Sequence, residues 1–276
     1  MLDKNIINMQ LLKKEKFGNN PHKCAIISCV HSNEDAGLKI FNLLKKNSAD
    51  LNFTLITITI TKEEKSKKSM NLNRLFNLPS CLLMNKSKES SLARKLHKEM
   101  MKYELVIDIH STNFKTPPYW IVVNLTPLIE KIIMLSNISN VLILNYKNSL
   151  ISIAKDAVGI EIGDNNDKKN IINAYKNLES ILLNFEEINT GNFKKRKLNY
   201  FVHIGEFKKD FIDRLNKKIK DFQLIRQDIL LGYKANRKVY SPLGFYPLWT
   251  RKDDVDKKYP IMCHILKRLN DEHIFK

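Results

Sequence analysis

Three short apolar runs in this chain each end in a side chain that can bind a metal or transfer a proton. The run 25–30 is followed by His31 and, three residues later, by Glu34, and the runs 105–109 and 158–160 end in a similar way. Uninterrupted apolar runs of this length are typical of buried parallel strands. Because the carboxyl ends of such strands line the ligand crevice of an open α/β sheet, the sequence predicts that the three endings meet at one place.

The second and third runs end in His110 and Glu161. Imidazole nitrogens and carboxylate oxygens are zinc ligands, and a catalytic zinc site uses three protein ligands and one open position. An HxxE sequence alone is typical of a solvated helix start, where the helix dipole favours a glutamate. The recurrence of the pattern favours a metal site, with a third ligand from elsewhere in the chain. Asp108 shares a strand face with His110 and is either the carboxylate that orients this imidazole or a buried polar group with other partners.

The rest of the chain predicts alternating strands and helices. Helical periodicity is found at about 38–46, 88–102, 127–136 and 167–185. We therefore expect an α/β fold with a mixed, largely parallel sheet flanked by helices. From about residue 189 the sequence becomes richer in prolines and aromatics, which predicts a domain at 1–188 and a smaller β-rich C-terminal domain at 189–276.

Composition excludes several classes of protein. The 276 residues carry 47 Lys and Arg against 29 Asp and Glu, a net charge of +18, but the lysines are spread along the chain, so we do not expect nucleic-acid binding. Cys24, Cys29, Cys81 and Cys263 lack CxxC spacing, which favours reduced core thiols. No apolar stretch approaches the roughly 18 residues that span a bilayer, and no signal peptide is recognisable, so we expect a soluble cytoplasmic protein without a membrane partner.

Four motifs, in this order, resemble those of the aspartoacylase and succinylglutamate desuccinylase family, relatives of the zinc carboxypeptidases. The segments 30–34, 71–76, 108–112 and 158–163 are similar to the family's H-G-N-E, D-L-N-R-x-F, D-L-H-S/N-T and V-G-I-E-V-G. A weaker similarity, at 241–247, falls in the C-terminal β portion of the family. Four motifs in the right order are far more specific than any one of them.

The resemblance implies a zinc carboxypeptidase-like fold and one Zn²⁺ per chain. It implies metal ligands at His31, Glu34 and His110, a general base and acid at Glu161, and binding of the substrate's α-carboxylate by Asn73 and Arg74.

The sequence also departs from the family pattern. The arginine that polarises the scissile carbonyl falls at Ser66, between Lys65 and Lys67, and lysine supplies a point charge instead of a bidentate fork. The arginine that aspartoacylases use for the substrate's side-chain carboxylate aligns with Ile151. Tyr259 is the nearest candidate for their C-terminal tyrosine.

From these residues we predict a zinc-dependent hydrolase that cleaves the amide bond of a small N-acyl amino acid to a carboxylate and a free amino acid. The alternatives are a metallocarboxypeptidase or amidase acting on peptide-like substrates, and a zinc-binding scaffold without activity. The absent arginines and Ser32, at a family glycine position, motivate the last alternative. A homo-oligomer is left open.

Overall fold

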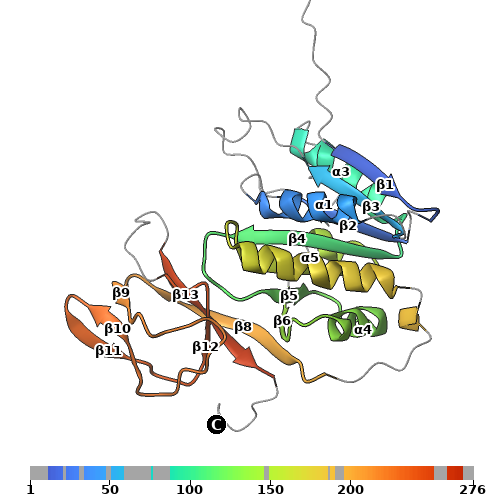
Figure 1. Ribbon diagram of the computed structural model, residues 1–276. Coiled ribbons are helices and arrows are strands. Elements are labelled where there is room, and N and C mark those ends of the chain that lie inside the picture. Colours follow the sequence, from blue (N-terminus) through green and yellow to red (C-terminus); the bar gives the residue numbers. More distant parts are fainter. Residues whose placement is uncertain are drawn as a thin grey trace, which may run out of the picture.

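The computed structural model describes residues 12–20, 23–30, 34–47, 51–58, 76, 88–145, 149–185, 187–189, 196–251 and 260–269 (Figure 1). The helices are α1 (Ala36–Lys46), α3 (Lys88–Met100), α4 (Pro127–Leu135), α5 (Lys168–Leu183) and the 3₁₀ turns η2 (Leu150–Ser152) and η3 (Glu187–Asn189). The strands of the first part are β1 (Leu12–Phe17), β2 (Cys24–Ser28), β3 (Phe53–Ile58), β4 (Leu105–Thr112), β5 (Tyr119–Val122), β6 (Asn140–Ile143) and β7 (Ala157–Asp164). The later strands are β8 (Asn199–Lys208), β9 (Arg214–Leu215), β10 (Leu230–Lys234), β11 (Arg237–Tyr240), β12 (Tyr246–Leu248) and β13 (Ile261–Arg268).

A ten-stranded mixed sheet organises the chain, in the order β1-β3-β2-β4-β7-β5-β6-β8-β13-β12. The strands β3, β2, β4 and β7 run parallel to one another, and β5 turns antiparallel to β7. The three apolar runs of the sequence are β2, β4 and β7, which are adjacent. Their carboxyl ends therefore meet at one edge, as the sequence predicts.

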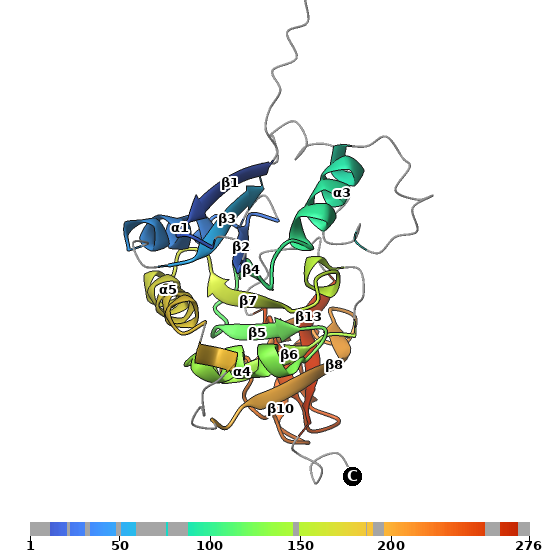
Figure 2. The same ribbon diagram turned by 90° about the vertical axis from the view of Figure 1, so that its right-hand side faces the viewer.

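Helices cover both faces of this sheet, as Figure 2 shows with α3 on one side and α1, α4 and α5 on the other. The larger apolar core lies between the sheet and α1, α4 and α5, and a second core lies beneath α3 and η2. The expected inward positions of α5 are buried, including Ala174 and Leu178. The predicted α/β fold is confirmed.

Local sequence signals define the ends of two of these helices. Helix α4 begins after Thr126, whose hydroxyl accepts a hydrogen bond from the Ile129 amide at 3.3 Å, and Pro127 occupies its first turn. Helix α5 begins after Asp167, whose carboxylate accepts hydrogen bonds from the amides of Lys169 and Asn170.

A glycine fixes the approach of α1 to β2, next to the predicted site. A Cβ at Gly37 would lie 1.9 Å from Ser28 Oγ, so only a residue without a side chain allows this packing. The segment between β2 and α1 carries Glu34. The close approach therefore holds Glu34 near the carboxyl end of the sheet.

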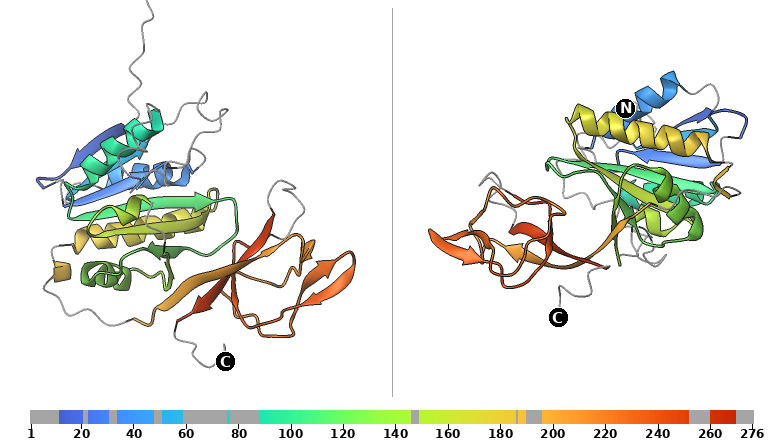
Figure 3. Two further views of the ribbon diagram at one scale, coloured as in Figure 1. Left: turned by 180° about the vertical axis from the view of Figure 1, so that it is seen from behind. Right: turned by 60° about the horizontal axis from the view of Figure 1, so that its bottom comes forward.

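The C-terminal residues form strands, in keeping with the predicted β-rich portion (Figure 3). β9, β10 and β11 make a separate antiparallel sheet, whereas β8 pairs in parallel with β6 and carries the large sheet on into β13 and β12. The two parts of the chain thus share one sheet. The domain boundary at 188 stays a prediction.

Two composition-based expectations can be compared with the structure. Cys24, Cys29 and Cys263 are buried and in the thiol form, and Cys81 lies outside the described residues. Among the described helices, none has the length and hydropathy needed to cross a membrane.

Candidate active site

The structure describes Glu34, His110 and Glu161 from the predicted site. His31, Asn73 and Arg74 lie outside the described residues, as do Lys65, Ser66, Lys67 and Tyr259. The described part of the site is therefore the end of β4, the end of β7 and the turn before α1.

His110 lies between two carboxylates near the end of β4. Its Nδ1 is 3.0 Å from Glu34 Oε2, and its Nε2 is 2.8 Å from Oδ2 of the buried Asp108. Of the two alternatives for Asp108, the hydrogen bond to the imidazole is confirmed. Asp108 therefore fixes the ring orientation and leaves Nδ1 facing Glu34.

The same contacts determine the charge of the imidazole. Burial lowers the pKa of His110, but the charges of Asp108 and Glu34 and their hydrogen bonds raise it by more, so the pKa lies well above its ordinary value. The raised pKa favours the protonated imidazole, in which both ring nitrogens carry a hydrogen and can donate to the two carboxylates.

Glu161 lies beside this group on the adjacent strand, where its Cα is the register partner of the Cα of His110. Its side chain is buried, and Oε1 accepts a long hydrogen bond of 3.4 Å from the Gly163 amide. Burial, with the charges of Glu34 and Asp108, raises the pKa of Glu161 to about 8, against the lowering effects of His110 and the Gly163 amide. Glu161 is thus a carboxyl group whose proton is easily exchanged near neutral pH.

The backbone after Glu161 depends on glycine. Gly163 has φ +80°, and a Cβ there would lie 2.3 Å from the Thr116 carbonyl oxygen. Only glycine adopts this conformation without strain at such close range. The glycine of the V-G-I-E-I-G segment thus holds the loop 113–118 against the end of β7.

Glu34, His110 and Glu161 line one cavity of about 880 Å³. Tyr119, on β5, also lines this cavity. Strand β5 pairs with β7 on the edge of β7 away from β4, and in this pairing Tyr119 lies opposite Glu161. Burial and the charge of Glu161 raise the pKa of this phenol well above its ordinary value. Sequence reasoning missed Tyr119 because the antiparallel pairing of β5 with β7 has no local sequence signal.

The remaining cavity walls are mostly apolar. Ile151, at the position of the family's second arginine, lines the cavity with its side chain 5% exposed. Ile121 and Leu142 also line the cavity. The described part of this wall therefore offers apolar contacts where the resemblance would place a guanidinium group.

The C-terminal strands supply another wall, which the sequence did not indicate. The cavity is lined by His203 of β8, Leu248 of β12, Trp249 directly after β12, and His264 of β13. Within the described residues, the group of side chains that could hold a metal is His203, Glu206 and His264. This His/Glu/His cluster differs from the predicted one, whose His31 lies outside the description.

The ligand atoms of Glu34 and His110 at the predicted centre fit a zinc ion. Tetrahedral zinc with ligand bonds of about 2.0–2.1 Å separates its ligand atoms by about 3.3 Å, and Glu34 Oε2 and His110 Nδ1 are 3.0 Å apart. The Asp108 carboxylate behind the imidazole is the partner that metal-binding histidines usually have. Both observations agree with a metal held by Glu34 and His110.

Comparison with known proteins identifies the architecture. The sequence matches no protein-family model and no curated protein. Murine aminoacylase 3 is similar in structure, with TM-score 0.69 and 15% identity over 91% of this chain and 97% of that one. The succinylglutamate desuccinylase/aspartoacylase from Rhodobacter sphaeroides gives TM-score 0.70 and 10% identity over 95% and 89% of the two chains.

The chain has the succinylglutamate desuccinylase/aspartoacylase fold. The succinylglutamate desuccinylase from Chromobacterium violaceum also shares it, with TM-score 0.61 and 18% identity over 90% of this chain and 85% of that one. At these identities the likeness concerns the fold. The proteins that share this fold include the family whose four motifs the sequence resembles.

Proposed function

We propose that the protein is a zinc-dependent hydrolase that cleaves the amide bond of an N-acyl amino acid. The observation that supports this most directly is the joint presence of Glu34, His110 and the buried Glu161 in one cavity, at adjacent strand ends. The neighbours named as desuccinylases and aminoacylases agree with a deacylase. His31 would be the third ligand.

Zinc at this site would lower the pKa of water toward about 7 and polarise the amide carbonyl. Asp108 would hold the imidazole of His110 in one orientation through its hydrogen bond of 2.8 Å. The burial of Glu161 keeps bulk water from its carboxyl group.

Glu161 would move the proton. As water adds to the amide carbon, one of its protons passes to the Glu161 carboxylate, and the same proton then passes to the nitrogen as the C–N bond breaks. The products are a carboxylic acid and an amino acid. A pKa raised to about 8 makes the protonated form of Glu161 a ready donor. The positive charge of a bound zinc ion, which would replace the proton on His110, would lower this pKa toward that of a working base.

Asn73 and Arg74 would bind the α-carboxylate of the substrate, a role that comes from the resemblance. The apolar wall at Ile151 favours an uncharged group at the position where aspartoacylases bind a second carboxylate. We therefore expect N-acyl derivatives of apolar amino acids to be hydrolysed faster than N-acetylaspartate.

A hydrolysis screen tests the proposal. The zinc-loaded chain is incubated with N-acetyl and N-succinyl derivatives of apolar, acidic and basic amino acids and with short peptides, and the released amines are measured. Turnover of acyl amino acids supports the proposal. Turnover of peptides alone would indicate a carboxypeptidase, and a chain that binds zinc without any turnover would indicate a scaffold.

The variant Glu161→Gln sharpens this test. It should retain zinc and lose about 10²- to 10⁴-fold in turnover, the usual contribution of a general acid–base. Glu104→Gln, at a side chain that is 56% exposed, is the matched control and should keep full turnover. An active Glu161→Gln enzyme would remove the catalytic assignment.

A further inference from the structure

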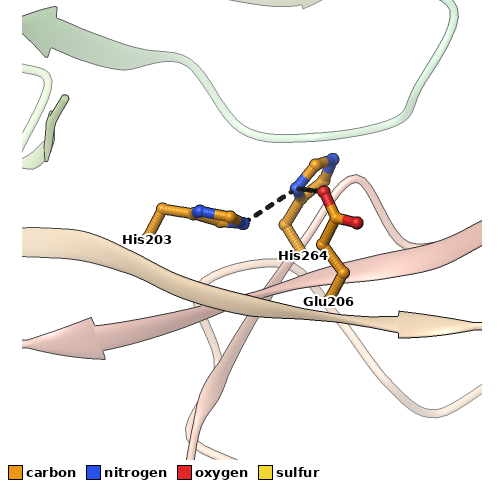
Figure 4. A group of neighbouring side chains, drawn as sticks. All are labelled: His203, Glu206 and His264. Carbon is orange, nitrogen blue, oxygen red and sulfur yellow. Dashed lines mark hydrogen bonds and ion pairs between the residues drawn. The ribbon is translucent and has the colours of Figure 1, made fainter. Parts of the chain in front are cut away.

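The cluster His203, Glu206 and His264 lies apart from the predicted centre, on the C-terminal wall of the cavity. Figure 4 shows the two β8 side chains, His203 and Glu206, converging with His264 of β13. His203 Nε2 is 3.2 Å from His264 Nδ1, and Glu206 Oε1 is 3.5 Å from the same nitrogen. The donor atoms of all three residues lie within 4.8 Å of one another.

An irregularity in strand pairing brings the three side chains together. Glu206 lies opposite His264 and His203 lies opposite Leu266, so β8 has one residue more than β13 between these pairs. The additional residue, Ile204, makes a β-bulge and is 49% exposed. In a regular strand, residues three apart point to opposite faces, and a bulge reverses this relation. The bulge therefore puts His203 and Glu206 on one face, with His264 opposite Glu206 on that face.

The imidazole of His264 is held in place from its other side. The Trp249 ring packs edge to face against it, with centroids 5.1 Å apart and an interplanar angle of 84°. Asp221 accepts hydrogen bonds from the amides of Trp249 and Thr250 at 2.9 and 3.0 Å. This support is of the kind that orients a ligand before it binds.

The donor spacings agree with those around a small metal ion. Ligand atoms of a tetrahedral zinc ion are about 3.3 Å apart, and the two measured spacings in the cluster are 3.2 and 3.5 Å. Two imidazoles and one carboxylate suit Zn²⁺, Ni²⁺ or Cu²⁺, whereas Mg²⁺ and Ca²⁺ prefer oxygen ligands. We propose that His203, Glu206 and His264 form a second transition-metal site, on the wall of the substrate cavity.

Charges of both signs lie near the cluster. The guanidinium group of Arg251, which lies over the Phe114 ring at 5.1 Å from its centroid, adds positive charge near His264. The Glu206 carboxylate offsets it. Three protein ligands leave a fourth position on a tetrahedral ion, and because His203 and His264 line the cavity, a cavity ligand could reach it.

This site is independent of the proposed hydrolase centre. In the order of the sheet, β7, β5 and β6 separate β4, which carries His110, from β8. A metal at the cluster therefore has its own protein ligands. Each site can be removed by mutation without changing a proposed ligand of the other.

Metal counting tests the proposal. The full chain without an affinity tag is dialysed to equilibrium against buffered Zn²⁺, and the zinc bound per chain is measured by mass spectrometry. We expect two ions for the wild type, one for His264→Gln, one for His110→Ala and none for the double variant. His97→Gln, at an exposed histidine of α3, is the matched control and should bind two.

The outcomes separate the two sites. If His264→Gln still binds two zinc ions, the second site is overturned and the hydrolase centre stands. The same holds if the wild type binds one ion and His110→Ala binds none. If the wild type binds one ion, His264→Gln binds none and His110→Ala binds one, the second site is supported. This result would count against the hydrolase centre.

A spectroscopic measurement covers the case in which His264→Gln fails to fold. His110→Ala loaded with Co²⁺ should show the strong visible absorption of a tetrahedral ion, and Glu206→Gln in that background should weaken Co²⁺ binding. A His110→Ala chain that binds no Co²⁺ while folded, as judged by circular dichroism, would overturn the second site.

Discussion

Glu161 should make the metal-free protein less stable as the pH rises. Burial, with the charges of Glu34 and Asp108, raises the pKa of Glu161 from its ordinary 4.5 to about 8, so the folded chain binds a proton that the unfolded chain releases. The contribution of Glu161 to the free energy of unfolding is fully present below pH 4.5 and is lost as the pH rises to 8. Since each pH unit corresponds to 1.36 kcal/mol, the full loss is about 5 kcal/mol.

Glu161→Gln removes this ionisation and keeps the shape of the side chain. The difference in the free energy of unfolding between the variant and the wild type should therefore grow between pH 5 and 9, in favour of the variant. Urea unfolding of chelator-treated protein, followed by circular dichroism at each pH, measures it. Because both proteins contain His110, comparing them at the same pH largely cancels the contribution of His110 to the free energy of unfolding.

Glu104→Gln is the control, because this glutamate is exposed, and its difference from the wild type should stay within about 0.5 kcal/mol at every pH. A Glu161→Gln difference that is constant over pH, or that shrinks as the pH rises, would refute the reasoning. It would mean that the carboxyl group is ionised in the folded protein.

Three further predictions concern support for the site and the core. Gly163→Ala should destabilise the chain by about 1–2 kcal/mol or more in urea unfolding, because of its φ of +80° and the contact of the new Cβ with a carbonyl oxygen. Asp108→Asn should weaken zinc binding by about 10- to 100-fold in a chelator competition, because the amide is a poorer acceptor for the His110 imidazole. Trp120→Phe should cost about 1–3 kcal/mol in thermal unfolding, because the buried ring loses volume and its 2.8 Å hydrogen bond to Ser136, and an unchanged melting temperature would contradict this.

Much of the first part of the fold follows from local patterns. The apolar runs are β2, β4 and β7, and the helical periodicities correspond to α1, α3, α4 and α5. The reason is that strands buried on both faces need continuous apolar residues, while helices that cover a sheet need an apolar stripe. The contact between Asp108 and His110 was foreseeable for the same reason, because alternate residues of a strand share a face.

The C-terminal wall of the cavity was not foreseeable in this way. Strand β13 was not predicted, and its pairing with β8 joins residues about 60 positions apart. The bulge at Ile204 changes which side chains share a face, and a single additional residue leaves no mark in the hydrophobic pattern. His203 and Glu206 therefore looked unrelated to each other and to His264.

The sequence by itself determined the apolar strands and the chemistry of the residues that end them, because burial and ligand type are properties of short segments. The tertiary structure alone decided which distant side chains share the cavity. Tyr119 next to Glu161, Ile151 on the cavity wall and the two histidines of β8 and β13 were brought together by strand order and register. Those depend on packing across the whole sheet, which no local pattern contains.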